Sequence, residues 1–525
     1  MDTSLYALLE RQSAARNDQV YLYWRDEEIS YAEFTRKVRQ AAHGLRALGV
    51  EHSDKVALLL GNCPEFLTIF FACAALGAVA VPINPRLKAE EVEYILQNSD
   101  SVVLVVADTL LPIIAPALDG CPQLHHIVIV GAVPETSITR PLHPFTSLSA
   151  ASDHPVSAAV GPEDIASIIY TSGTTGRPKG VLLSHGNYLF DVWSYATACQ
   201  ISEADRLLCM LPLFHVNAQV ASVLSALHQG GALILLEGFS PREFLPALAR
   251  YRATSFSAVP TIYAILNNLP DAGQYDLSSL RVCICGAAPM PVEVFERFEQ
   301  IYRAFILEGY GLSEGTCVST LNPLDGRPRK IGSIGVALPG QEVRIVDDQG
   351  QPVPPGTVGE IVIRGPNVMQ GYYKNPEATA AAIRDGWLFT GDLGSRDADG
   401  YFFIVGRKKE MIIRGGENIY PKEIEEVLYR HPAVAEAAVV GLPDPIWSEQ
   451  VAAFIVAHPG ISVSAETIIE HCRAHLADFK CPQVVEFVES FPKTATGKIQ
   501  KNRLVERYAG LSAHRSPDAE AGSKS

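Results

Sequence analysis

The chain has 525 residues, a length that predicts two to four domains. Apolar residues make up 47% and charged residues 19%, the balance of a globular protein. With 43 Lys and Arg against 58 Asp and Glu the net charge is −15, which argues against nucleic acid as a partner because that requires a basic face. The negative net charge is still compatible with binding of a small nucleotide, because one local pocket of backbone N–H groups and a lysine is enough to bind its phosphates.

The cysteine pattern and the N-terminus both predict a cytoplasmic protein. The ten cysteines show no metal-like pairing, which is typical of a reducing compartment. The N-terminal MDTSLYALLERQ has no basic start and no long apolar core, so we expect no signal peptide. The apolar run from Phe66 to Ile83 is cut by Gly77 and Pro82, so we expect a buried helix, a glycine stop and a strand at Ala78–Val81, and no membrane span.

The chain alternates between apolar β-branched runs and amphipathic stretches from about residue 40 to 310. This is the βαβ pattern of helix-covered sheets. The predicted strands there are Val102–Val106, Ile127–Val130, Ile165–Tyr170, Ala232–Leu236 and Leu280–Cys285. Short strands separated by Gly, Pro and Asp turns follow, which predicts an antiparallel or barrel-like piece. These strands are Glu342–Val346, Gly359–Arg364 and Gly400–Val405.

A small α+β domain is predicted after Arg407. Its predicted elements are a helix at Pro421–Arg430, strands at Ala435–Val440 and Val451–Val456, and a helix at Ala465–Ala477. The predicted fold is therefore α/β and α+β multidomain: a large N-terminal domain of helix-covered mixed sheets with a small β-barrel-like piece, and a small C-terminal α+β domain. The tail at 511–525, rich in Ser, Ala and charge, is predicted to be disordered.

A loop rich in glycine and hydroxyl groups follows the predicted strand Ile165–Tyr170. It contains Thr171, Ser172, Gly173, Thr174, Thr175, Gly176 and Lys179. Glycines let backbone N–H groups approach an anion, hydroxyls bind phosphate or magnesium, and the lysine supplies charge. The kinase P-loop spacing is absent, because only two residues separate Gly173 from Gly176. The competing interpretation, a flexible linker, does not explain Arg-Pro-Lys-Gly between two buried elements.

This loop resembles the phosphate loop of the superfamily of acyl-CoA synthetases, non-ribosomal peptide adenylation domains and luciferases. Further stretches match in the same order, so that the resemblance covers about residues 5 to 507. They are Gly286-Ala-Ala-Pro289, Glu308-Gly-Tyr310-Gly-Leu-Ser-Glu314, Trp387-Leu-Phe-Thr-Gly-Asp392, Gly406-Arg407-Lys-Lys409, Arg414-Gly-Gly-Glu-Asn-Ile-Tyr-Pro421 and Pro492-Lys-Thr-Ala-Thr-Gly-Lys498. The resemblance implies an enzyme with ATP, Mg²⁺ and CoA as cofactors.

The resemblance also implies roles in nucleotide binding. Gly286 and Ala287 would form one side of the adenine slot, and Tyr310 would stack on the base. Ser313 would contact the α-phosphate or the carboxylate, and Glu314 would hold magnesium together with Thr171. Asp392 would accept from the ribose hydroxyls, and Arg407 would contact ribose and phosphate. The adenosine set is completed by Glu308, Gly309 and Ile404. Taken alone, Gly286 also fits a strand-to-helix turn, Asp392 a turn, and Arg407–Arg414 a solvated basic loop.

A two-step reaction follows from the same resemblance. The carboxylate attacks the α-phosphate of ATP, with Lys498 as the catalytic lysine that neutralises developing charge. The expected domains are 1–407 and 408–510, with a hinge at Lys409 about which the smaller one rotates. CoA would then enter beside Gly415, Gly416 and Lys480, and its thiol would displace AMP.

The acid is less well specified than the reaction. The region of His215 and Asn217 matches the acyl pocket, to which Gly309 and Val336 also contribute; His215 fits equally a packed histidine at a helix start. Malonate-activating relatives carry an arginine where Gly309 stands, so a second carboxylate is disfavoured and a fatty or aryl acid favoured. The alternatives are an enzyme that loads an acyl or aminoacyl group onto an acyl carrier protein, and a non-catalytic nucleotide-binding scaffold. The sequence leaves a homodimer open.

Overall fold

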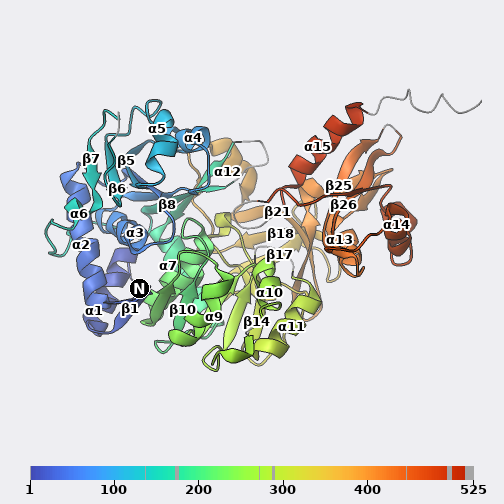
Figure 1. The fold of residues 1–525 in the computed structure, drawn as a ribbon, viewed down its shortest axis with the longest axis horizontal. Helices are drawn as coiled ribbons and strands as arrows, with labels where there is room; N and C mark the ends of the chain where they lie inside the picture. The colour runs from blue at the N-terminus through green and yellow to red at the C-terminus, as the bar shows by residue number, and fades with distance from the viewer. Residues whose placement is uncertain are drawn as a thin grey trace, which may run out of the picture. The chain divides into compact units, whose positions relative to one another are not determined.

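The structure is a computed structural model that describes residues 2–135, 138–171, 177–270, 272–286, 290–444, 446–493 and 499–514 (Figure 1). The chain divides into two compact units. The first comprises Met1–Arg344, Val362–Thr390 and Gly400–Phe402, and the second comprises Ile345–Ile361, Gly391–Asp399 and Phe403–Ser525. In the described part of the chain, no helix is both long and apolar enough to cross a membrane.

An eight-stranded sheet in the first unit has the order β19-β9-β8-β4-β3-β5-β6-β7. Its strands are β3 (Lys55–Leu59), β4 (Val79–Pro82), β5 (Ser101–Ala107), β6 (His126–Val130), β7 (Leu142–Pro144), β8 (Ile165–Thr171), β9 (Lys179–Ser184) and β19 (Gly371–Tyr372). Pairing is parallel from β8 to β7, and β9 is antiparallel to both β8 and β19. Its apolar residues pack against α4 (Ala89–Ser99) and α5 (Leu111–Leu118).

The predicted interruption of the apolar run after residue 66 is confirmed. Helix α3 (Pro64–Leu76) is buried and ends at Gly77, whose φ of 70° is the left-handed conformation that glycine adopts without strain. Strand β4 follows directly.

A nine-stranded sheet, also in the first unit, has the order β16-β15-β14-β13-β12-β10-β11-β1-β2. Its strands are β1 (Val20–Trp24), β2 (Glu27–Ser30), β10 (Arg206–Cys209), β11 (Ala232–Leu235), β12 (Ser255–Ala258), β13 (Val282–Cys285), β14 (Phe305–Tyr310), β15 (Thr320–Leu321) and β16 (Val336–Ala337). The predicted α/β pattern is confirmed, with strand ends within two residues of the predicted ones. Helices α9 (Pro241–Arg250), α10 (Pro260–Leu266) and α11 (Val292–Tyr302) contribute to its core.

The barrel-like piece is a five-stranded sheet in which β17-β18-β21-β20 are adjacent and β22 pairs with β21. Its strands are β17 (Glu342–Val346), β18 (Gly359–Arg364), β20 (Ile383–Arg384), β21 (Trp387–Arg396) and β22 (Phe402–Arg407). The predicted bounds of β17 and β18 are confirmed. The division between the two units falls inside β17, β18, β21 and β22.

The second unit contains a sheet of order β24-β23-β26-β25, with β27 beside β26. Its strands are β23 (Ile412–Arg414), β24 (Glu417–Ile419), β25 (Val434–Asp444), β26 (Ser448–Ala457) and β27 (Val484–Phe487), and helices α13 (Pro421–Tyr429) and α14 (Ala465–Arg473) pack on it. The α+β prediction is confirmed. Helix α14 ends before the predicted Ala477, where the backbone becomes extended.

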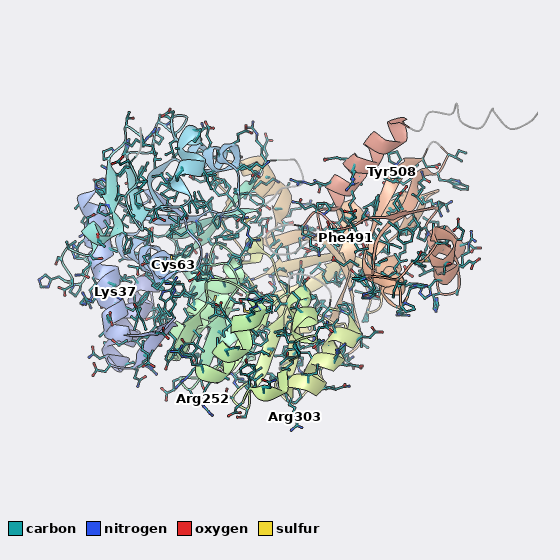
Figure 2. All side chains as sticks on the ribbon, in the orientation of Figure 1. Lys37, Cys63, Arg252, Arg303, Phe491 and Tyr508 are labelled. Atoms are coloured by element: carbon teal, nitrogen blue, oxygen red, sulfur yellow. The ribbon has the colours of Figure 1, made fainter. Side chains whose placement is uncertain are left out.

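Helix α15 (Lys501–His514) is the last element. The predicted disordered tail began at 511, but the helix continues to His514, and residues 515–525 lie outside the described residues. Leu504 of the helix is buried in a cluster with Phe491, and the ring of Tyr508 lies edge-on to Phe454, 6.2 Å between centroids; Phe491 and Tyr508 are labelled in Figure 2. This packing anchors the first turns of the helix, which explains why it forms there.

Candidate active site

The predicted phosphate loop lies at the tip of the β8–β9 hairpin. Thr171 and Lys179 are paired directly opposite each other at its end. The five residues Ser172 to Gly176 are outside the described residues. Helix α7 (His185–Ala198) follows β9, and Ser184 caps it through a reciprocal pair of hydrogen bonds with Asn187. The hairpin therefore places a hydroxyl and an ammonium group at the two ends of the loop.

The motif from Glu308 to Glu314 occupies the end of β14 and the turn after it. Glu308, Gly309 and Tyr310 are the last residues of β14, where Gly309 and Tyr310 pair with β15. Ser313 and Glu314 lie in the following 3₁₀ turn. Glu308 is buried, and its Oε2 accepts from the backbone N–H of Gly332 at 3.2 Å. The motif thus contains two carboxylates: that of Glu308 is buried, and that of Glu314 is partly exposed.

Tyr372 is a residue of this site that the sequence analysis missed. Its hydroxyl donates to Glu314 Oε1 at 2.9 Å, and the ammonium group of Lys179 lies 5.0 Å from the centroid of its ring. Two backbone contacts hold Tyr372 near Glu314. Strand β19, which contains Tyr372, pairs with β9, and the Met369 N–H donates to the Glu314 carbonyl at 2.8 Å. Burial and the adjacent Glu314 carboxylate raise the Tyr372 pKa, so the hydroxyl remains a donor.

The predicted acyl-pocket residues form two groups. Gly309 and Val336 both pair with Leu321, from opposite sides, so they flank the same residue of β15. A Cβ at Gly309 would lie 2.8 Å from the Leu321 side chain, so only glycine fits without a shift.

His215 and Asn217 precede a π-helix, Ala218–Leu224, a rare element that is frequent at functional sites. Among the described residues neither His215 Nε2 nor Asn217 Oδ1 has a hydrogen-bond partner, although both atoms are buried. Burial lowers the pKa of His215 to about 4, so the ring is neutral at neutral pH. Buried polar atoms without partners cost free energy, so these two atoms would favour a ligand that hydrogen-bonds to them.

The predicted ribose residues belong to the second unit. Asp392 in β21 is buried, and its Oδ1 lies 3.0 Å from Nε of Arg407 at the end of β22. Ile404 lies on the same strand, and its carbonyl accepts from Lys422 Nζ at 2.8 Å. Lys409 follows in a 3₁₀ turn, and burial together with the nearby Arg407 lowers its pKa. The structure therefore brings Asp392 and Arg407 together as an ion pair.

The predicted CoA residues also lie in the second unit. Gly415 and Gly416 form the turn between β23 and β24 with φ of 60° and 89°, conformations that favour glycine. A Cβ on Gly415 would lie 2.8 Å from the Trp447 ring. The ammonium group of Lys480 lies 2.7 Å from a Glu423 oxygen, so it is already paired.

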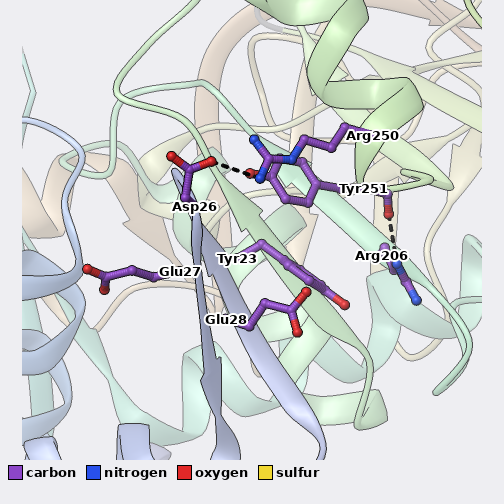
Figure 3. Close-up of a pocket in the computed structure, with 7 residues that line it drawn as sticks. All are labelled: Tyr23, Asp26, Glu27, Glu28, Arg206, Arg250 and Tyr251. Atoms are coloured by element: carbon purple, nitrogen blue, oxygen red, sulfur yellow. Dashed lines mark hydrogen bonds and ion pairs between the residues drawn. The ribbon is translucent and has the colours of Figure 1, made fainter.

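Two further predicted residues, Ala287 and the catalytic lysine Lys498, lie outside the described residues; Gly286 directly follows β13. A polar cavity of about 250 Å³ that the sequence did not predict lies at the β1–β2 hairpin (Figure 3). Two of its charges pair with each other, since Asp26 lies 2.8 Å from Arg250, and Arg206 donates to the Tyr251 carbonyl at 3.0 Å.

Fold and site together define an adenylate-forming ligase, and comparison with known proteins agrees. A feruloyl-CoA synthase from Amycolatopsis sp is 40% identical over 480 residues, which cover 91% of this chain and 94% of the relative. A long-chain-fatty-acid–CoA ligase from Bacillus subtilis (strain 168) is 35% identical, with 96% and 94% covered. The solved structure of the anthranilate CoA ligase AuaEII with anthranoyl-AMP matches with a TM-score of 0.90 at 33% identity, covering 97% and 98%.

The family described as AMP-binding enzyme matches residues 9–373, and its C-terminal domain matches residues 423–498. The chain belongs to this family of AMP-binding enzymes. The predicted enzyme class, an AMP-forming acyl-CoA synthetase, is thereby confirmed.

Proposed function

We propose that this enzyme activates a hydrophobic fatty or aryl carboxylic acid with ATP and transfers the acyl group to CoA. In the first step a carboxylate oxygen bonds to the α-phosphorus, the bond to the bridging oxygen breaks, and pyrophosphate leaves. In the second step the CoA sulfur attacks the acyl carbon, loses its proton, and AMP leaves. The observation that carries the proposal is the Lys179–Tyr372–Glu314 arrangement beside the phosphate-loop hairpin.

The oxygen atoms at this place suit a magnesium ion. Magnesium is held by one or two carboxylates plus substrate phosphates, and Glu314 offers a partly exposed carboxylate. Thr171 supplies a hydroxyl at the adjacent hairpin end. We assign the ion to Glu314 and Thr171, where it would neutralise charge on the phosphates.

The remaining roles rest on the motifs. Lys498 supplies the cation of the adenylation step, and Ser313 orients the α-phosphate or carboxylate. Tyr310 stacks on adenine, while Asp392 and Arg407 bind the ribose. The Asp392 carboxylate lies 3.0 Å from Arg407 Nε and can accept from hydroxyl groups, which supports this assignment.

The second half-reaction is assigned to the smaller domain, 408–510, rotating at Lys409. Gly415 and Gly416 admit the pantetheine arm because they carry no side chains. Lys480 binds CoA once its pair with Glu423 opens.

The substrate class is supported by both the pocket and the relatives. Gly309 has no cation to offer a second carboxylate, and Leu321 between Gly309 and Val336 is apolar. His215 is neutral, so it supplies a hydrogen bond and no charge. The relatives are named for feruloyl, long-chain-fatty-acid and anthranilate CoA ligation. Ten unpaired cysteines support a reducing compartment, the cytoplasm.

A panel of carboxylic acids in acid-dependent ATP–pyrophosphate exchange tests this proposal. Cinnamic-type aryl acids and medium- to long-chain fatty acids should support exchange, and malonate should not. Thioester formation with CoA should exceed loading of an acyl carrier protein. If none of the acids supports exchange, the proposal is wrong and the chain is a nucleotide-binding scaffold. If the acyl group is transferred to the carrier protein in preference to CoA, the chain is the stand-alone adenylating enzyme.

A further inference from the structure

The backbone adopts a rare conformation directly after Ser313 and Glu314. Thr316 has φ of 66° and ψ of −60°, and the Cys317 N–H donates to the Gly315 carbonyl at 2.9 Å. This is a γ-turn of the positive-φ type, which is rare and strained. Threonine is branched at Cβ, so a positive φ is a true outlier for it. Strain of this kind persists only where surrounding contacts enforce it, and it gathers at active sites.

Asn367 supplies contacts that enforce this γ-turn. Its backbone carbonyl accepts from the Thr316 hydroxyl at 2.6 Å, and its side-chain amide donates to the Gly315 carbonyl at 3.1 Å. Thr316 and Asn367 are both fully buried, so solvent cannot take over these hydrogen bonds. One residue therefore holds both the strained threonine and the glycine before it.

The segment that carries Asn367 is itself anchored to the helix that follows the phosphate-loop hairpin. The side-chain amide of Asn187, in the first turn of α7, donates to the carbonyls of Pro366 and Val368 at 2.7 and 3.0 Å. These two carbonyls flank Asn367 in the chain. Since α7 begins directly after β9, hydrogen bonds connect the open end of the hairpin with the turn that follows Glu314.

We propose that Asn367 is a positioning residue for adenylation, which holds the γ-turn at Thr316 and thereby fixes the backbone that carries Ser313 and Glu314. The proposal rests on the proposed function, which assigns Glu314 to magnesium and Ser313 to the α-phosphate or carboxylate. Magnesium demands near-ideal octahedral geometry, so a shift of the Glu314 carboxylate would weaken its binding. The thiol step follows the departure of pyrophosphate, so it should depend much less on this turn.

Thr316→Val tests the proposal, because valine keeps the branched shape and loses the hydroxyl donor. We expect acid-dependent pyrophosphate exchange to fall about tenfold, since one buried hydrogen bond is lost. The magnesium concentration for half-maximal exchange should rise, whereas thioester formation from supplied acyl-adenylate and CoA should be retained. Thr316→Ser keeps the hydroxyl and should behave like the wild type in both assays.

Asn367→Ala removes the other hydrogen bond, to Gly315, and should separate the two half-reactions in the same way. Asn267→Ala is the matched control. The buried Asn267 amide also donates to a backbone carbonyl, that of Val294 at 2.8 Å, and neither Asn267 Oδ1 nor Asn367 Oδ1 has a partner among the described residues. Asn267→Ala should lower the urea denaturation midpoint as Asn367→Ala does, and leave both half-reactions unchanged.

Equal loss of both half-reactions in Thr316→Val and Asn367→Ala would overturn the proposal, as would an unchanged magnesium dependence. If these two variants do not fold, Thr316→Gly replaces them, because glycine adopts this φ without strain. It lacks the hydroxyl and should also lose exchange selectively, so wild-type exchange in Thr316→Gly would overturn the proposal. A wild-type enzyme that activates no acid would refute the proposed function instead. The role of the turn would then be decided by the magnesium dependence of ATP binding, measured by calorimetry, which should shift in Thr316→Val.

Discussion

The Tyr372 hydroxyl donates to Glu314 Oε1 at 2.9 Å while the same ring lies beneath the Lys179 ammonium group. One side chain therefore touches both the carboxylate assigned to magnesium and the lysine assigned to the phosphates. Tyr372→Phe removes the hydroxyl and keeps the ring. We expect adenylation, measured by pyrophosphate exchange, to fall about tenfold and the magnesium concentration for half-maximal rate to rise, since a charge-assisted hydrogen bond is worth about 1.5–3 kcal/mol.

The neighbouring Tyr373→Phe is the matched control, because that hydroxyl bonds to Asp100 instead. A purely structural role for Tyr372 would lower the rate without moving the magnesium dependence. An unchanged magnesium dependence in Tyr372→Phe would therefore refute the positioning role.

Tyr372 also shows where sequence patterns stop being informative. The strand β19 has two residues, too few for any periodicity, and it pairs with β9 far away in the chain. Strands such as β5 were predictable because a run of buried β-branched residues is a local signal. The family was predictable because glycines and polar residues at fixed spacing carry the family resemblance. Side-chain pairs such as Lys480 with Glu423 carry no such signal.

The ion pair between Asp392 and Arg407 leads to a prediction about ATP binding. Asp392→Asn removes the charge that both holds Arg407 and accepts from the ribose hydroxyls. We expect KM for ATP to rise about tenfold, with a smaller change in kcat, because ribose binding is retained through the reaction. The control is Asp348→Asn. The Asp348 carboxylate pairs at the surface with Lys408, the residue after Arg407, at 2.8 Å, so its loss should leave the KM for ATP unchanged. Equal effects of the two substitutions would show that general surface charge is responsible.

We expect the first unit to lose stability in mild acid because it contains a buried histidine, His185. His185 is fully buried at the start of α7, and its Nδ1 accepts from the Leu5 N–H at 3.3 Å. Burial lowers its pKa to about 4, and the positive end of the helix also opposes protonation. Since the unfolded chain binds the proton near pH 6.5, stability is complete above that pH and is lost as pH falls towards 4.

We expect His185 alone to lower the free energy of unfolding by about 2 kcal/mol between pH 7 and pH 5. The measurement is the change in the urea denaturation midpoint between these two pH values. His185→Asn keeps an acceptor for Leu5 but cannot titrate, so it should lose less stability between pH 7 and 5. The exposed His125→Asn should behave like the wild type. A wild-type slope retained in His185→Asn would contradict the assignment.

The two half-reactions should separate in a variant of Lys498. Its ammonium group is assigned to the charge that develops as the carboxylate attacks phosphorus, and the thiol step does not require that charge. Lys498→Ala should therefore reduce pyrophosphate exchange by at least about a hundredfold, yet still form the thioester from supplied acyl-adenylate and CoA. Lys493→Ala is the control, since that nearby lysine pairs with Glu436 at 2.6 Å and should retain both half-reactions. Equal loss of both half-reactions in Lys498→Ala would mean that the residue supports the fold or both conformations, and its assignment to adenylation alone would fall.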